Sequence, residues 1–312
     1  MINIVRYSQL YRKQWSEFVA SSKNGTFLID RNYMDYHSDR FEDYSIMAYK
    51  NNNLKAILPC SVSNNNILTS HAGLTYGGLL TDHTIRTPEM LLVMKKMMEF
   101  FVRNNIKEVY YKTIPHIYHK LPAEEDLYCL FRNNFELYRR DVSSSINIKS
   151  TTIKGKKING AKRAQKLGME LVEMEDCQSL IDLINTNLKE KYGTVATHTA
   201  QELNFLKNRF DKNIKFYHAV LQGKILGGAV MFITDTVAHA QYIVTNDEGK
   251  SKRALDFMIV TLVNHFNNIV DWFDYGISTA ENGQVLNESL IKSKEDFNMS
   301  AICYDTYRAV LK

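Results

Sequence analysis

The sequence is poor in cysteine, with only four in 312 residues. They are widely separated, so no two have the spacing of a redox motif, and none combines with histidine at zinc-site spacing. Scattered cysteines of this kind predict reduced thiols in a cytoplasmic protein, with no metal site. The four are Cys60, Cys129, Cys177 and Cys303.

Long apolar runs are also absent from the sequence. A helix that spans a bilayer needs about 20 consecutive apolar residues, and no stretch approaches that length. Residues 2–15 are interrupted by polar and charged side chains and lack the apolar centre of a signal peptide. We therefore expect a cytoplasmic chain without a membrane span.

The composition is that of a globular protein large enough for two domains. Hydrophobic residues make up 45% and charged residues 23% of the chain, which is typical of packed domains. The net charge of +5 is small for this length. It permits anionic ligands but does not by itself predict a nucleic-acid partner. No flexible Gly/Ser linker separates the two halves.

One order of secondary structure is predicted in the first half of the chain. Alternating and apolar stretches predict strands at 44–50, 54–62 and 67–78, separated by Asn-rich turns. A helix then opens at Thr87, the expected N-cap, with Pro88 in its first position. The unit closes with a strand at 106–113.

The second half repeats this order. Strands are predicted at 215–221, 225–234 and 237–245, followed by a loop around Gly249, an apolar-striped helix and a closing strand at 270–278. His71 and His239 take equivalent places in the two halves.

Helical segments precede the strands in both halves. They are expected near 8–20 and 30–37 in the first, and near 177–190 and 199–210 in the second, where Thr199 and Glu202 form a capping-box pattern. The shared order predicts a duplicated α+β (α/β) domain, each copy a mostly antiparallel mixed sheet flanked by helices. The predicted domains are 1–145 and 146–312.

A strand at 139–150 and a basic helix at 152–168 are expected where the halves join. The lysines and arginines of this helix are either a solvated surface or an electropositive wall for an anionic substrate. Both interpretations stay open from the sequence.

Six segments spread over nearly the whole chain give it a resemblance to a known group of enzymes. Taken in their order along the chain, the segments and the two-unit pattern resemble tandem GNAT N-acyltransferases of the FemAB-like type. More specifically, they resemble acyltransferases of bacterial O-antigen and capsule gene clusters. The segments are FLIDRNYMDYHSDRFEDYS (27–45), SHAGLTYGGLL (70–80), KTIPHIYHKLPAEEDLY (112–128), HTAQELNFLKNRF (198–210), AHAQYIVTNDEGKSKRALD (238–256) and DYGISTAENGQVLNESLIKSKEDF (274–297).

The resemblance implies a reaction and its substrates. An acyl group would pass from coenzyme A to the amine of a nucleotide-linked deoxyamino sugar, with dTDP as the expected nucleotide, for lipopolysaccharide or capsule synthesis. Acyl-CoA and the nucleotide sugar are thus the expected partners. No nucleic acid and no metal are expected.

The donor is expected to bind in the second half. A helix N-terminus suits phosphate, and the cations around Gly249 would add counter-charge there, although a solvated basic turn is the alternative. The resemblance implies that the backbone of the preceding strand binds the thioester. The donor-binding candidates are Tyr242, Val244, Thr245, Gly249, Lys250, Ser251, Lys252, Arg253 and Asn287.

The first half lacks this Gly-Lys-Ser arrangement, so we expect that it has lost coenzyme A binding and shapes the acceptor pocket. A tight structural bend is the alternative explanation for its glycine-rich stretch at 73–78. The acceptor-binding candidates are Tyr76, Gln241, Ser278, Lys294 and Glu295.

Acyl transfer to an amine needs the amine in its neutral form, and histidine is the natural base near neutral pH. His239 is one candidate, with Gln241 on the same strand face as an orienting partner. His198 is its rival, because it directly precedes a capped helix. Either histidine can instead be structural, and direct attack aided by positioning alone is also open.

Two other functions compete with this one. A FemX-like peptidoglycan aminoacyltransferase would take its donor from tRNA and would favour a strongly basic face. A non-catalytic binding protein would keep the fold and bind coenzyme A without turnover.

Overall fold

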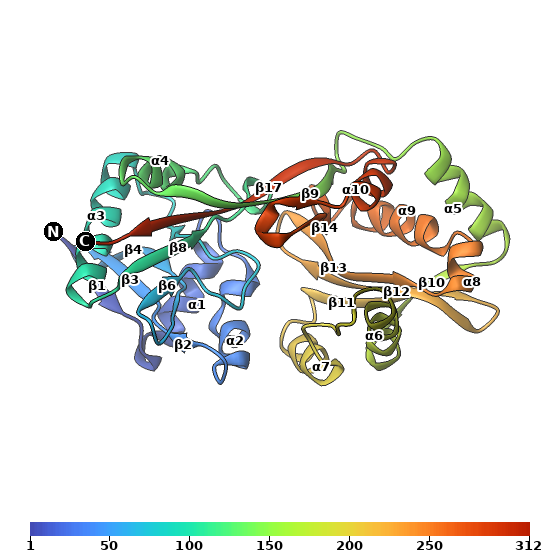
Figure 1. Cartoon of the computed structure of the whole chain (residues 1–312), viewed down its shortest axis with the longest axis horizontal. Helices are drawn as coiled ribbons and strands as arrows, with labels where there is room; N and C mark the ends of the chain where they lie inside the picture. The colour runs from blue at the N-terminus through green and yellow to red at the C-terminus, as the bar shows by residue number, and fades with distance from the viewer. The chain divides into compact units, whose positions relative to one another are not determined.

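The structure is a computed structural model that describes the backbone of residues 1–312 and every side chain except those of residues 191 and 192. The chain forms two compact units, drawn in Figure 1. Unit 1 comprises Met1–Asp141, Thr279–Val285 and Cys303–Lys312, and unit 2 comprises Val142–Ser278 and Leu286–Ile302. The predicted domains, 1–145 and 146–312, did not include this return of C-terminal residues to unit 1.

Unit 2 contains one mixed sheet and five longer helices among its described residues. Its strands are β10 (Glu170–Met174), β11 (Ile214–Leu221), β12 (Lys224–Ile233), β13 (Val237–Thr245), β14 (Trp272–Ile277) and parts of β9 (Glu136–Asn147), β16 (Val285–Leu286) and β17 (Ser300–Val310). Its helices are α5 (Lys156–Lys166), α6 (Gln178–Tyr192), α7 (Ala200–Arg209), the five-residue α8 (Asp247–Ser251), α9 (Ala254–Phe266) and α10 (Glu288–Glu295).

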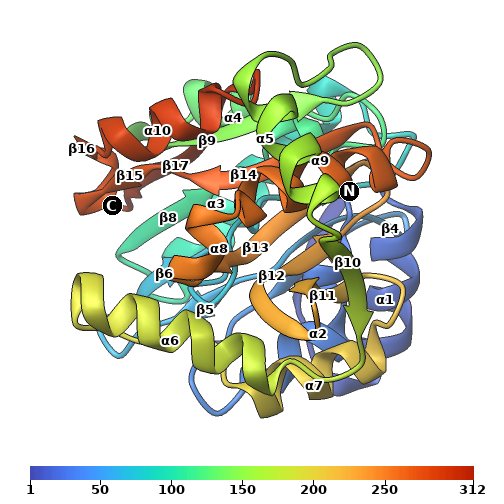
Figure 2. The same cartoon turned by 90° about the vertical axis from the view of Figure 1, so that its right-hand side faces the viewer.

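The strands of unit 2 lie in the order β10-β11-β12-β13-β14-β9. Neighbours are antiparallel except β13 and β14, which are parallel. Helices α5 and α9 cover one face of this sheet, and α6 and α7 cover the other (Figures 1 and 2). The predicted capping box before α7 is confirmed, because the Thr199 hydroxyl and the Glu202 carboxylate each accept from the other's backbone N–H.

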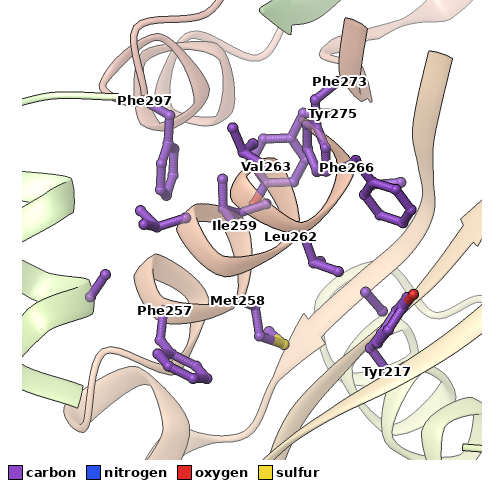
Figure 3. Close-up of a cluster of buried hydrophobic side chains, with 14 of the residues drawn as sticks. Tyr217, Phe257, Met258, Ile259, Leu262, Val263, Phe266, Phe273, Tyr275 and Phe297 are labelled. Atoms are coloured by element: carbon purple, nitrogen blue, oxygen red, sulfur yellow. The ribbon is translucent and has the colours of Figure 1, made fainter. Parts of the chain in front are cut away.

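The core of unit 2 is built around α9. Its apolar side chains recur at helical spacing and pack against the inner face of the sheet, as Figure 3 shows for Met258, Leu262 and Phe266. Phe273 on β14 and Phe297 after α10 close the same cluster. Burial of these side chains fixes β13 and β14 against a rigid helix.

Unit 1, like unit 2, consists of both strands and helices. Its strands are β1 (Ile2–Arg6), β2 (Glu42–Asp43), β3 (Ile46–Lys50), β4 (Asn53–Leu58), β5 (Ser61–Val62), β6 (Ile67–Thr69), β7 (Leu80–Thr81), β8 (Glu108–Lys112), β15 (Thr279–Ala280), and parts of β9, β16 (Val285–Leu286) and β17 (Ser300–Val310). Its helices are α1 (Arg12–Ser21), α2 (Arg31–Met34), α3 (Thr87–Arg103) and α4 (Glu125–Arg132), with short 3₁₀ turns between.

The predicted repeat is visible in the strand pairing of the two units. In unit 1 β6 and β8 pair in parallel over three residues, as β13 and β14 do in unit 2. The first unit departs from the prediction at two places. The strand expected at 54–62 breaks between β4 and β5, where Pro59 stands, and only 67–69 of the stretch 67–78 is a strand. The predicted N-cap Thr87 is wrong, because α3 begins at Thr87 and Arg86 is its N-cap.

No helix in the described part of the chain is both long enough and apolar enough to span a membrane.

The packing of α9 generates a stability prediction. Leu262→Ala should lower the free energy of unfolding by about 2–5 kcal/mol, because Leu262 is fully buried and its loss leaves a cavity. Leu167→Ala is the matched control, since Leu167 is 50% exposed. Urea denaturation of both variants measures the difference. Equal free energies of unfolding would contradict this account of the core.

Candidate active site

Strand β13 contains a bulge at the centre of the candidate site. Val230 of β12 is opposite Tyr242, but the next residue, Met231, is opposite Ala240, so Gln241 is an extra residue. One inserted residue reverses the alternation of side chains along the rest of a strand. His239 and Tyr242 therefore lie on the same sheet face, and Ile243 lies on the other.

The face that carries His239 and Tyr242 is the one covered by α6 and α7. Phe232, opposite His239, and Tyr242 both have ring contacts with His198, which lies just before α7. The opposite face holds the α9 core, to which Ala238 and Ala240 belong. Hence the polar side chains of β13 are separated from the hydrophobic core by the sheet itself.

The pairing of β13 with β14 ends at His239. Only Val237–His239 pair with Trp272–Asp274, although β13 continues to Thr245. The N–H of Asn246 donates to Leu226 O, so the alternation of an antiparallel ladder directs the N–H of Ile243 away from β12. That N–H therefore faces the side on which β14 has separated from β13.

His239 forms a hydrogen bond with a buried carboxylate at this point. Its Nδ1 lies 2.7 Å from Oδ2 of Asp274, whose side chain is fully buried. Oδ1 of Asp274 accepts hydrogen bonds from Ser143 Oγ at 2.5 Å and Ser145 Oγ at 2.7 Å, both from β9. The backbone N–H of Gly276 is a longer donor at 3.4 Å. The His239 side chain itself remains 16% exposed.

The pKa of Asp274 reflects these contacts. Burial alone would raise the pKa of this carboxyl, because the charged form loses its hydration. The hydrogen bond and charge of His239, with the Ser143 and Ser145 hydroxyls, outweigh burial and hold the pKa well below its ordinary value. Asp274 is therefore a carboxylate throughout the neutral range and can only accept hydrogen bonds.

A buried lysine fixes the end of β14 just beyond Asp274. Gly276 has a φ of +83°, a conformation that favours glycine, and a second irregularity in pairing lies between Asp274 and Ile277. Lys294 of α10 donates from Nζ to the carbonyl oxygens of Gly276 at 2.7 Å and Ile277 at 2.9 Å. Burial lowers the pKa of Lys294 to about 8. At least two of its three donor positions thus serve the backbone and not a substrate.

His198 and Tyr242 form a second polar pair on this face. The Tyr242 hydroxyl accepts from the His198 N–H at 3.3 Å and lies 2.9 Å from His198 Nδ1. Burial raises the pKa of Tyr242, which keeps the phenol protonated. Since the hydroxyl oxygen already accepts from a backbone donor, its proton is available for Nδ1 of His198. The contact engages Nδ1 of His198 in either tautomer, and Nε2 carries the ring proton when the Tyr242 hydroxyl is the donor.

The loop expected to bind donor phosphates is partly filled by its own hydrogen bonds. Helix α8 stands where an open loop was expected, and Asn246 Oδ1 accepts from the Gly249 N–H at 2.7 Å. The N–H groups of Lys250, Lys252 and Arg253 donate to backbone carbonyls within the same segment. A Cβ on Gly249 would collide with Leu226 O, so this glycine is needed for packing against β12. The backbone N–H groups of these four residues are therefore already in use.

The cations of this loop are mostly directed to solvent. Lys250 pairs with Asp247 at 2.6 Å, and both side chains are more than half exposed. Lys252 is exposed. Arg253 has a left-handed φ of +62° and lies 3.7 Å from the buried Asp256. Ser251 donates to Glu248 O. The side chains of the three cations can therefore contact an anion, whereas the backbone N–H groups of this segment are already used in hydrogen bonds.

The other predicted donor residues have mainly structural contacts. Asn287 is the N-cap of α10, with Oδ1 accepting from the Leu290 N–H at 3.0 Å. Thr245 is buried, whereas Val244 is partly exposed beside Tyr242 on β13.

The predicted acceptor residues are dispersed. Tyr76 belongs to unit 1, is 1% exposed, and donates to Thr26 Oγ1. Ser278 is buried, and its Oγ has no hydrogen-bond partner among the described residues. Glu295 is exposed on α10, and Gln241 is partly exposed at the bulge. Of these, only Gln241 lies on the strand that carries His239.

Sequence reasoning missed the residues that complete the site, namely Asp274, Ser143 and Ser145. It also placed His71 as the equivalent of His239. In the parallel pairing of unit 1, the position of His239 is taken by Thr69 and that of Asp274 by Tyr110. The acid–base pair is thus present only in the copy of unit 2.

Within the described residues, no group of three or more histidine, cysteine, aspartate or glutamate side chains is placed to hold a metal ion.

No family model and no curated protein sequence matches the chain. Solved structures do resemble it. FemX has a TM-score of 0.69 at 9% identity and covers 97% of this chain and 96% of its own. The C-terminal domain of a proposed lysylphosphatidylglycerol synthetase from Agrobacterium fabrum has a TM-score of 0.61 at 11% identity, covering 98% and 92%.

A tandem GNAT protein from the clavulanic acid biosynthesis pathway has a TM-score of 0.52 at 10% identity, covering 100% of this chain and 99% of its own. The chain has a tandem GNAT-like fold. This confirms the predicted fold class, antiparallel-dominated sheets flanked by helices. Identities this low show the fold alone.

The burial of Lys294 generates a pH-dependent prediction. Its folded-state pKa of about 8 lies below the unfolded value of about 10.4. Between these values the unfolded chain binds more protons, so stability contributed through Lys294 rises with pH. Relative to that of Lys294→Met, the free energy of unfolding of the wild type should rise by about 1 kcal/mol per pH unit from pH 8 to 10.

Denaturant unfolding at several pH values measures this difference. Lys292→Met is the matched control, because Lys292 is exposed on the same helix. A difference between wild type and Lys294→Met that stays flat with pH would mean that Lys294 is not buried as described.

Proposed function

We propose that the chain is an N-acyltransferase that moves an acyl group from acyl-CoA to the amine of a nucleotide-linked, dTDP-type deoxyamino sugar. The observation that carries the transferase assignment is the His239–Asp274 pair, 2.7 Å apart, at the residue where β13 and β14 stop pairing. In this proposal the donor lies where the two strands diverge, beside the N–H of Ile243 that faces away from β12. The amino-sugar acceptor rests on the sequence resemblance alone.

His239 is the base in this proposal. Asp274 can only accept a hydrogen bond, so Nδ1 of His239 carries the proton and Nε2 keeps its lone pair. As the amine nitrogen bonds to the thioester carbonyl carbon, Nε2 takes one of its protons. The carbon–sulfur bond then breaks, and the proton can pass to the thiolate of coenzyme A.

Developing negative charge on the carbonyl oxygen needs a donor. The N–H of Ile243 faces the side where β14 has diverged, and Gln241 supplies the extra residue that turns the strand there. A backbone donor fixed in a sheet is already oriented before the reaction, which is the arrangement that stabilises an oxyanion most. We assign the oxyanion contact to this segment of β13.

His198 has a different role in this proposal. Its Nδ1 is engaged by the Tyr242 hydroxyl, so the ring can present a proton on Nε2. With Nδ1 accepting from the Tyr242 hydroxyl and the proton on Nε2, such a ring is poorly suited to take a proton from a substrate amine. We therefore assign acceptor binding, and not base catalysis, to the His198–Tyr242 pair.

Donor phosphates are assigned to side chains. With the backbone N–H groups of the α8 segment in use, Lys250, Lys252 and Arg253 are the groups left to contact the pyrophosphate and 3′-phosphate of coenzyme A. Val244 and Thr245, on β13, lie between these cations and His239 in the chain. In this proposal unit 1 does not bind coenzyme A.

A second candidate is aminoacyl transfer from tRNA, and one observation favours it. Residues 142–169 contain seven lysines and arginines and no aspartate or glutamate. Helix α5 buries Gly160, Ala161 and Ala164 and leaves Lys156, Lys162, Arg163 and Lys166 exposed. A basic surface without acidic residues suits the many phosphates of a nucleic-acid backbone. It carries more positive charge than a single coenzyme A molecule needs.

The base assignment is tested by His239→Gln. The variant should lose about 10²–10⁴-fold in kcat with little change in KM, since only proton transfer is removed. Release of free coenzyme A thiol from a panel of acyl-CoAs, with dTDP-linked amino sugars as acceptors, measures the rate. His198→Gln is the comparison and should raise the KM for the sugar instead. Wild-type kcat in His239→Gln would exclude His239 as the base.

The donor site is tested by replacing Lys250, Lys252 and Arg253 together with alanine. The dissociation constant of coenzyme A, measured by calorimetry, should rise at least about tenfold, because several phosphate contacts are lost. The control removes the same charge from α5, at Lys162, Arg163 and Lys166, and should leave the constant unchanged. If neither variant alters coenzyme A binding but the α5 variant weakens binding of aminoacyl-tRNA, the second candidate replaces the first.

A further inference from the structure

Strand β9 carries three consecutive buried serines, which is unusual for the interior of a sheet. Ser143, Ser144 and Ser145 are each at most 1% exposed. Central strands normally carry β-branched and apolar residues, and a buried hydroxyl is costly unless it has a hydrogen-bond partner. The neighbouring Ile146 is buried in the α9 core, as a sheet of this kind requires.

Two of the three serines have the same partner. Ser143 and Ser145 alternate with Ser144 along the strand, so their side chains share a face, and both hydroxyls donate to Oδ1 of Asp274. Ser144 points to the other face, and its Oγ has no partner among the described residues. The strand therefore supplies Asp274 with a matched pair of donors and offers an internal control in Ser144.

We propose that Asp274, together with Ser143 and Ser145, forms a positioning array that holds the His239 ring in the tautomer with its proton on Nδ1. This inference rests on the proposed function, because it explains how the base is kept ready. It goes further in assigning three residues that contact no substrate atom. They act through His239.

The inference depends on the different hydrogen-bond partners of the two carboxylate oxygens of Asp274. Oδ1 is occupied by the two hydroxyls and the Gly276 N–H, which leaves Oδ2 for the His239 ring. With Oδ1 tied to β9, the carboxylate cannot rotate away from His239. Because an ionised carboxylate can accept but not donate, its contact through Oδ2 requires a proton on Nδ1, and in the neutral ring the lone pair is then on Nε2.

The array also accounts for the fate of the positive charge. When Nε2 takes the amine proton, the imidazolium lies 2.7 Å from a carboxylate that is already ionised. No proton has to move to Asp274, and the charge is neutralised in place. Burial of Asp274 strengthens this pairing, because little water screens it.

Unit 1 shows what the same strand pairing looks like without the array. The equivalent positions are Thr69 and Tyr110, which cannot form a charged pair. The parallel pairing of three residues is thus compatible with either set, so the fold itself does not demand a buried carboxylate at Asp274. Its presence in unit 2 needs a reason other than folding.

The tautomer can be measured without knowing any substrate. The full chain, labelled with ¹⁵N in its histidine rings, reports by NMR which ring nitrogen of His239 carries the proton. Wild type should show a protonated Nδ1. In Asp274→Asn the amide can donate to Nδ1 and should shift the proton to Nε2. A wild-type ring protonated on Nε2, or one unchanged in Asp274→Asn, overturns the inference.

Activity separates this inference from the proposed function. Asp274→Asn should lower kcat about 10²–10⁴-fold with KM nearly constant, as expected when a general base is misdirected. Ser143→Ala/Ser145→Ala should lower kcat at least tenfold, whereas Ser144→Ala, the buried control, should retain wild-type kcat. The same thiol-release assay with acyl-CoA and dTDP-linked amino sugars applies.

Each failure has its own signature. If His239→Gln abolishes turnover but Asp274→Asn and the serine double variant match wild type, the array is wrong and the function stands. If His239→Gln is fully active, the proposed base is wrong. If Asp274→Asn does not fold, the serine double variant and the wild-type NMR spectrum still decide, because both keep the carboxylate.

Discussion

A charge in the middle of a sheet is the constraint on which unit 2 depends. Asp274 has no contact with solvent, so every stabilising interaction of its charge has to come from the protein. Donors reach it from two neighbouring strands, through His239 on β13 and two serines on β9, and from its own backbone at Gly276. The three central strands are therefore linked by side chains as well as by their ladders.

This requirement explains several otherwise odd local features. Polar serines occupy a central strand, a glycine with positive φ follows Asp274, and a lysine is buried to bind the carbonyls of Gly276 and Ile277. Each would be a cost if taken alone. Together they hold the end of β14 in a shape that leaves the ladder with β13 after three residues. On the opposite face, the hydrophobic packing of α9 fixes the positions of the strands. The polar groups can therefore keep the orientations that their hydrogen bonds need.

Much of the fold could be predicted from the sequence because its determinants are local. Strand β13 has the predicted limits, 237–245, and the capping box at Thr199 follows from side chains three residues apart. The bulge at Gln241 could not be predicted, since it exists only relative to the register of β12. The partnership of Ser143 with Asp274 joins residues 131 apart in the chain, and nothing in either local sequence indicates it. Helix α8 was missed for a different reason: the Asn246 side chain caps it, and the glycine inside it was taken as a sign of an open loop.

The bulge in β13 has a consequence for how this strand tolerates insertions and deletions. Because it shifts the alternation by one, Ala240 and Ile243 both point to the α9 core although they are three residues apart. Deleting Gln241 would restore a regular strand and force one of its halves to exchange faces. Either His239 would enter the hydrophobic core, or Ile243 would leave it. The length of β13 is thus as strongly constrained as the identity of its polar residues, and a single missing codon would do more harm here than most substitutions.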